Sequence, residues 1–133
     1  MPLYQGEFEV RPTPEPAADL GDGVSLMHMR FDKTFTGPLA AQSVVQMLGV
    51  MDAAVGSGGY VAIERVVGAL DGRDGTFLLQ HSSTLARGAQ AQSITVIPDS
   101  GTGALAGLEG RMTITITGGR HHYTFDCTFA DAG

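Results

Sequence analysis

The stretch that decides the fold is 111–129, "RMTITITGGRHHYTFDCTF", in which two runs of alternating apolar and polar residues flank a pair of glycines. Alternation with a period of two is typical of a strand with one buried face, and a Gly-Gly pair supplies the positive φ angles of a tight hairpin turn. If Thr117 pairs with Arg120, then Ile114 and Tyr123 share the apolar face, and threonines dominate the other. The sequence therefore predicts an antiparallel hairpin whose apolar face packs on a core and whose other face is exposed to solvent.

Strand patterns also fill most of the chain before this hairpin. The other predicted strands cover residues 4–11, 25–36, 42–54, 59–70, 75–86 and 91–98. The segment "SVVQMLGVM" is also compatible with a short helix, but its β-branched residues favour a strand. Segment 11–24, "RPTPEPAADLGDGV", is rich in proline and glycine and is predicted to be a loop over one rim. Because no amphipathic helix separates the strands, we expect one domain over residues 1–133, an all-β, eight-stranded antiparallel up-and-down barrel.

Composition excludes several classes of partner. The chain has 133 residues, 43% of them hydrophobic, which is enough for a core without disulfides. Its formal net charge of −6 argues against nucleic acid or an anionic membrane as a partner. The single cysteine, Cys127, excludes an intramolecular disulfide. The first residues lack a basic, then apolar, signal sequence, and no apolar run reaches the ~18 residues of a transmembrane helix. We therefore expect a cytoplasmic protein.

The segment "PDSGTGALAGLEG", residues 98–110, holds four glycines between two β-branched runs. A phosphate-binding loop requires a strand, a glycine turn and then a helix, often with a Lys-Ser/Thr pair. Here a strand pattern follows and no such pair is present. The glycines are better explained as devices for turns and for close approach of backbone segments.

Two parts of the sequence carry a family resemblance. "PDSGTGALAGLEGRMTI" resembles the glycine-rich hairpin of allene oxide cyclase-like barrels, which dirigent proteins share. "GYVAIERVVGALDGRDGTFLLQHSSTLARG" followed by "ITVIPDSGTGALAGLEG" resembles the bacterial domain-of-unknown-function family 3224. The resemblance implies an allene oxide cyclase-like or avidin-like β-barrel and no particular activity. The wider group of barrels includes metal-independent cyclases and isomerases as well as binding proteins, and a fold does not fix a function.

Three ionisable residues are the candidate catalytic groups. Lys33 alternates with apolar residues and is either a snorkelling lysine near a strand end or a cation inside the barrel. Glu64 lies on an apolar face, and its relation to His81 depends on the loop "DGRDG". Pairing of Leu70 with Gly75 places Glu64 directly opposite His81, whereas pairing one residue later places the two on opposite faces. We favour the first register. An enclosed Glu–His pair beside a lysine is suited to acid–base chemistry, and a structural ion pair is the alternative.

The predicted wall of the barrel interior is aromatic and apolar. The candidate ligand-binding residues are Tyr60, Tyr123, Met29, Phe31, Phe77 and His121. His121 and His122 are adjacent on a strand and point to opposite faces, so they are not expected to share a metal ion. We expect neither a metal nor a cofactor.

Three functions fit these residues, and they leave open whether the protein is an enzyme. The first is binding of a small apolar or weakly acidic molecule in the barrel. The second is a metal-independent cyclase or isomerase that uses the acid–base groups. The third is an oligomeric scaffold with a filled interior.

The central strands are apolar on both faces, which predicts a homo-oligomer, most simply a dimer. Val61, Ile63 and Val67 lie opposite the residues assigned to the interior. Several exposed aliphatic side chains on one surface exceed what monomers usually carry. A symmetric pair of chains would cover them.

Overall fold

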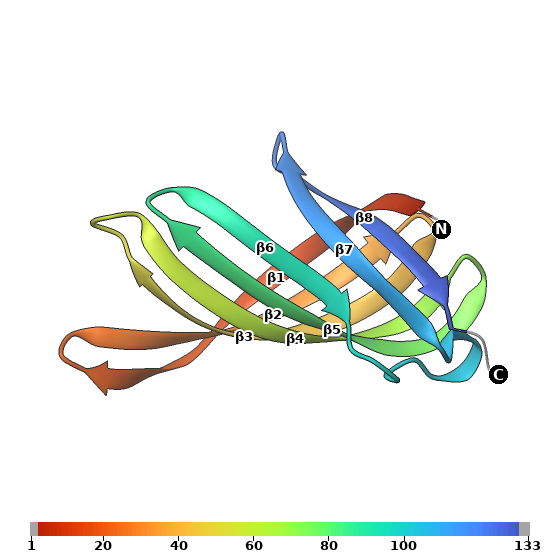
Figure 1. Cartoon of the computed structure of the whole chain (residues 1–133), viewed down its shortest axis with the longest axis horizontal. Helices are drawn as coiled ribbons and strands as arrows, with labels where there is room; N and C mark the ends of the chain where they lie inside the picture. Colours follow the sequence, from red (N-terminus) through yellow and green to blue (C-terminus); the bar gives the residue numbers. More distant parts are fainter. Residues whose placement is uncertain (1–2, 131–133) are drawn as a thin grey trace.

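The period-two patterns form eight strands in the computed structural model, which describes residues 3–130 (Figure 1). The strands are β1 (Leu3–Gly21), β2 (Val24–Thr36), β3 (Leu39–Asp52), β4 (Ser57–Leu70), β5 (Arg73–Ala86), β6 (Ala89–Val96), β7 (Leu108–Thr117) and β8 (Arg120–Phe129). Each strand pairs antiparallel with the next, and β8 pairs with β1. The predicted eight-stranded antiparallel barrel is confirmed. The one helical segment described is a single 3-10 turn, Gly103–Leu105.

The hairpin of β7 and β8 has the predicted register. Thr117 pairs with Arg120 and Ile114 with Tyr123, around the turn at Gly118 and its neighbouring glycine. The apolar face of this hairpin points into the barrel, where Tyr123 is almost fully buried. The alternation alone was sufficient here because the turn fixes which residues face each other.

The predicted rim loop over residues 11–24 was wrong. β1 continues to Gly21 and pairs with β2 through residues such as Thr13, which lies opposite Arg30. Three prolines, at positions 12, 14 and 16, have the same parity, so their missing N–H groups fall on one edge of the strand. Within residues 3–130, strand β8 pairs with residues 3–8 of β1 and leaves the remaining edge free, and a free edge tolerates proline.

One end of the barrel is filled by side chains. The buried hydrophobic core includes Phe35, Leu39, Leu70, Phe77, Leu79, Leu105, Leu108, Tyr123 and Phe125. The glycine-rich segment crosses this end and inserts Leu105 into the core. A Cβ atom at Gly101 would collide with the backbone carbonyl of Leu105, and Gly103 has a φ of +59°. These glycines therefore serve the backbone path, as the sequence predicted, and a strand rather than a helix follows them.

The opposite end is open. The hairpins β1–β2, β3–β4 and β5–β6 extend together at the left of Figure 1, away from the two chain ends. In the described part of the chain, β6 pairs with β7 only through Ile94 with Met112 and Thr95 with Arg111. Beyond these pairs the two strands diverge toward the open end (Figure 1). The barrel is thus closed and packed at one end and hollow at the other.

None of the helical segments in residues 3–130 has the length and hydropathy needed to cross a membrane.

Candidate functional site

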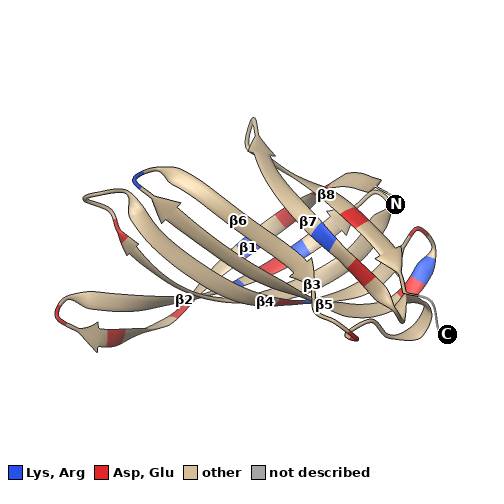
Figure 2. Cartoon of the chain, in the orientation of Figure 1, with Lys and Arg blue, Asp and Glu red and all other residues tan. Residues whose placement is uncertain are grey.

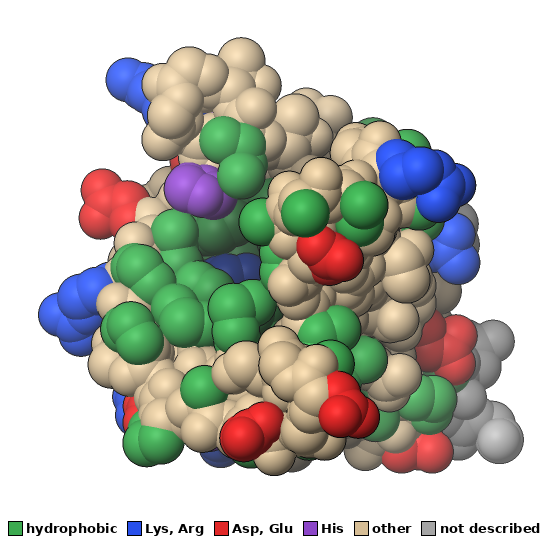
Figure 3. All heavy atoms as spheres, turned by 90° about the vertical axis from the view of Figure 1, so that its left-hand side faces the viewer, with side chains coloured by type: hydrophobic (Ala, Val, Ile, Leu, Met, Phe, Trp, Pro, Cys, Tyr) green, Lys and Arg blue, Asp and Glu red, His purple; other side chains and the backbone are tan. Residues whose placement is uncertain are grey.

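The open half of the barrel contains a cavity of about 320 Å³. Every one of the eight strands contributes to its wall, which includes Phe8, Phe31, Val45, Met47, Tyr60 and Ala62. Figure 3 looks into this end and shows a hollow surrounded mainly by hydrophobic side chains, with a basic side chain in its depth. Among the described wall residues, Lys33 is the one lysine or arginine. A second cavity of about 290 Å³ lies at the mouth and shares Met47 and Tyr60 with the first.

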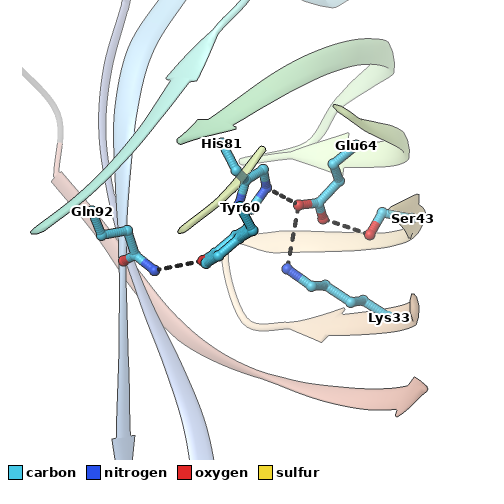
Figure 4. A network of polar contacts seen from close by, with 6 residues as sticks. All are labelled: Lys33, Ser43, Tyr60, Glu64, His81 and Gln92. Carbon is cyan, nitrogen blue, oxygen red and sulfur yellow. Dashed lines mark hydrogen bonds and ion pairs between the residues drawn. The ribbon is translucent and has the colours of Figure 1, made fainter. Parts of the chain in front are cut away.

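Glu64 is the centre of a buried polar cluster beside the cavity (Figure 4). It projects inward from β4 and has no solvent exposure. One carboxylate oxygen, Oε1, lies 2.7 Å from Nε2 of His81 and 3.2 Å from Nζ of Lys33. The other oxygen, Oε2, accepts a hydrogen bond of 2.6 Å from the Ser43 hydroxyl. The three predicted catalytic residues are therefore in contact, and Ser43 completes the cluster.

The strand register brings these side chains together diagonally. Lys33 on β2 is paired with Ser43 on β3, while Glu64 on β4 is paired with Val45. Side chains at an opposite position and two residues along a neighbouring strand lie on one face within reach of each other. All four members of the cluster therefore face the interior from four consecutive strands.

The favoured register of the β4–β5 hairpin was wrong by two residues. Leu70 pairs with Arg73, not Gly75, so His81 lies opposite Ala62 and diagonal to Glu64. The reason is that Asp71 and the following glycine form the tight turn themselves, both with positive φ, as Asp-Gly pairs do in two-residue hairpins. A shift of two residues preserves the face of every side chain, so the predicted sharing of a face holds although the predicted pairing does not.

The cluster holds Glu64 in its ionised form. Burial by itself raises the pKa of this carboxyl, but the His81 hydrogen bond, the charge of Lys33 and the Ser43 hydrogen bond together lower the pKa below its ordinary value. An ionised carboxylate only accepts hydrogen bonds, so Nε2 of His81 carries a proton. Lys33 also lies 4.6 Å from the centroid of the Phe8 ring, close enough for a cation–π contact.

The predicted ligand-binding residues divide into two groups. Tyr60, Phe31 and His121 line the cavity. Phe77 and Tyr123 instead belong to the packed core of the closed end. Phe77 stacks on Phe125, and the Tyr123 hydroxyl accepts a hydrogen bond from the Leu39 amide and donates one to the Thr36 carbonyl. Met29 is half-buried and does not contribute to the wall of either cavity.

The sequence reasoning missed several residues of the site. The most important is Ser43, which holds the second oxygen of Glu64. Ser43 alternates with Ala41 and Val45 and therefore lies on the same inward face of its strand. A polar residue on an otherwise apolar face was the signal that could have identified it. Gln92, whose amide nitrogen lies 3.4 Å from the Tyr60 hydroxyl, gave no such signal because the next residue on the same face of its strand, Gln90, is polar as well.

Within residues 3–130, no three His, Cys, Asp or Glu side chains come together in a way that could hold a metal ion. The Cys127 thiol is buried in the core, and burial raises its pKa to about 11, so it is kept as an unreactive thiol.

Comparison with known proteins agrees with this architecture. The model of the family described as "Protein of unknown function (DUF3224)" matches residues 4–127. A crystal structure of a protein with unknown function from the same family, from Shewanella oneidensis MR-1, is 46% identical in sequence, with a TM-score of 0.93 over 98% of this chain and 99% of that one. No curated protein matches the sequence. With a barrel of this topology and a family match over nearly its whole length, the chain belongs to the DUF3224 family.

Proposed function

We propose that the barrel binds a small, mostly apolar molecule in its open half, with a hydrogen-bonding group of the ligand directed at Lys33. The observation that carries this proposal is the cavity itself, an apolar hollow with a buried ammonium group on its wall. Ligand sites are commonly concave and mostly apolar, with a few polar groups that fix the orientation of the ligand.

Lys33 supports the proposal because its hydrogen-bonding capacity is not exhausted. An ammonium group has three donors, and in residues 3–130 Lys33 donates one hydrogen bond, to Glu64. The Tyr60 hydroxyl adds a further polar group on the same wall. A carbonyl or carboxylate oxygen is the kind of acceptor that these donors would hold. The scaffold hypothesis requires a filled interior, and the open cavity counts against it.

Filling the cavity is expected to remove binding. Ala62 lies on the wall and is 5% exposed, so Ala62→Phe places a ring in the hollow. A neutral naphthylamine dye, whose fluorescence rises in apolar surroundings, is the probe. We expect the Kd of the dye to rise about tenfold or more, which corresponds to ~1.4 kcal/mol.

The matched control is Val61→Phe, because Val61 is the neighbouring residue and projects outward with 56% of its surface exposed. This variant is expected to bind the dye like the wild type. If Ala62→Phe does not fold, Ala62→Leu tests the same wall with a smaller side chain. Unchanged dye affinity in a folded Ala62 variant would show that the dye binds elsewhere and would contradict the proposal.

A second candidate function is acid–base catalysis, favoured by the 2.7 Å contact between His81 and the Glu64 carboxylate. A carboxylate fixes the orientation of an imidazole, which is the arrangement of a general acid or base. Conversion of a bound molecule, followed by NMR and lost in His81→Gln, would distinguish a cyclase or isomerase from a binding protein.

A further inference from the structure

We infer that the cavity takes an acid with an apolar chain, and that the acid binds as an anion together with one proton, which His81 receives. This inference rests on the proposed function, because it concerns the ligand of the same cavity. It names the chemical class of that ligand and makes its affinity depend on pH.

The charges of the polar cluster lead to this conclusion. Lys33 and Glu64 are both buried and lie 3.2 Å apart, so their charges compensate each other. A carboxylate placed against Lys33 would add an uncompensated negative charge beside these buried side chains. Such a charge is costly unless another group changes its protonation state. Uptake of one proton nearby restores neutrality.

His81 is the group placed to receive that proton. Its Nε2 already donates to Glu64, while its Nδ1 makes no hydrogen bond within residues 3–130. His81 lies on the cavity wall, so a second proton on its ring would be next to the bound molecule. A neutral imidazole that gains this proton becomes a donor at both nitrogens, one to Glu64 and one to the ligand.

The other ionisable groups that face His81 are few. From the strands around the cavity they are Glu64 and Tyr60 on β4, Lys33 on β2 and His121 on β8. The described wall residues of β1, β3, β6 and β7 are not ionisable: Phe8, Val10, Val45, Met47, Gln90, Gln92, Ile114 and Ile116. Among these described wall residues, His121 is therefore the one other imidazole. It packs against Phe8 and has no contact with Glu64 within the described residues.

The shape of the hollow favours a chain rather than a compact molecule. The deeper cavity, with Lys33 on its wall, adjoins the mouth cavity through Met47 and Tyr60. Met27 and Met51 line the mouth, and methionine adapts to apolar ligands of varied shape. Lys33 and Met27 are six residues apart on β2, which is roughly 20 Å along a strand. An acid held at Lys33 would extend its chain past these methionines.

Calorimetric titration with decanoate tests the inference, with decanol as the uncharged probe. The titrations are made at about pH 8 in buffers of different ionisation enthalpy. We expect the complex to take up close to one proton from the buffer for each decanoate bound, and none for each decanol bound. Linkage then requires the Kd of decanoate to rise with pH, by about tenfold per pH unit where one full proton is taken up, while that of decanol stays constant.

Variants assign the proton. His81→Gln keeps an amide donor for Glu64 and is expected to bind decanoate more weakly and without proton uptake. His28→Gln is the control, because His28 lies on the outer face, hydrogen-bonded to Gln46. Decanoate binding without proton uptake by the wild type would overturn the inference, as would loss of the uptake in His121→Gln with retention in His81→Gln. If decanol binds and decanoate does not, only this inference falls; if neither binds, the proposed function falls with it.

Discussion

Replacing Glu64 with alanine is expected to lower the free energy of unfolding by about 3–5 kcal/mol, the typical effect of removing one partner from a buried ion pair. Glu64 has no exposed surface and its carboxylate is the common acceptor for Lys33, His81 and Ser43. Its removal leaves a buried ammonium group without a counter-charge. Urea denaturation at neutral pH, followed by circular dichroism, measures the loss.

Two further variants make this result specific. Arg65→Ala alters the neighbouring, exposed residue and is expected to change the free energy of unfolding by no more than about 0.5 kcal/mol. The double variant Lys33→Met with Glu64→Leu removes both charges and is expected to recover most of the loss, because apolar residues of similar size often replace buried pairs without cost. A loss below about 1 kcal/mol in Glu64→Ala would mean that the cluster is hydrated and that the charges are not buried in solution.

The difference in unfolding free energy between the wild type and Glu64→Gln is expected to depend on pH with a definite sign. The pKa of Glu64 is lowered in the folded protein from its ordinary value of 4.5. A lowered carboxyl pKa contributes stability that is fully present above the unfolded pKa and is lost as the pH falls through the folded pKa. The stability gap between the wild type and Glu64→Gln is therefore expected to be constant near neutral pH and to narrow below about pH 4.5.

Strand parity predicted the membership of the cluster because the side-chain period of a strand is two. Lys33, Glu64 and His81 are far apart in the sequence, yet each interrupts an apolar inward face, and the barrel brings such faces together. For the misplaced residues, parity predicted the correct face of the strand but not the position along the barrel axis. Phe77 and Tyr123 point inward as predicted, but they lie at the filled end. Parity carries no information about the position along the barrel axis at which packing ends and the cavity begins.

Strand parity also could not predict the register of the β4–β5 hairpin or the full length of β1. Two Asp-Gly pairs, at 71–72 and 74–75, can each form the β4–β5 turn, and both choices leave Glu64 and His81 on one face. In the structure the first pair forms the turn, with positive φ at Asp71 and Gly72. The prolines after Val10 indicate a break when the strand is considered alone. They become acceptable once its outer edge is known to be free of β8.

The outer face of the central strands is the basis of our proposal that the protein is a homodimer. Val61, Ile63 and Val67 on β4 and Leu48 on β3 are between 43% and 56% exposed. The outward side chains of these strands carry little charge. In residues 39–51, 57–70 and 75–86, Arg65 is the one Lys, Arg, Asp or Glu besides Glu64, and the side chains of Glu64 and His81 point inward. Figure 2 shows these strands largely free of charge between their ends. In a chain of net charge −6, two copies repel each other least through a face without acidic residues.

We expect light scattering at micromolar concentration to give twice the 13.9 kDa mass of one chain. Ile63→Lys is expected to reduce the mass to that of a monomer, because in a two-fold symmetric contact each substitution occurs twice and buries a charge where an aliphatic side chain stabilised the interface by up to about 1.5–3 kcal/mol. Thr113→Lys, on the outward face of β7, is the control and should leave the dimer intact. A wild-type mass of 13.9 kDa would contradict the proposal. The apolar face of β3 to β5 would then stay exposed in solution, and the protein would be expected to self-associate nonspecifically as its concentration rises.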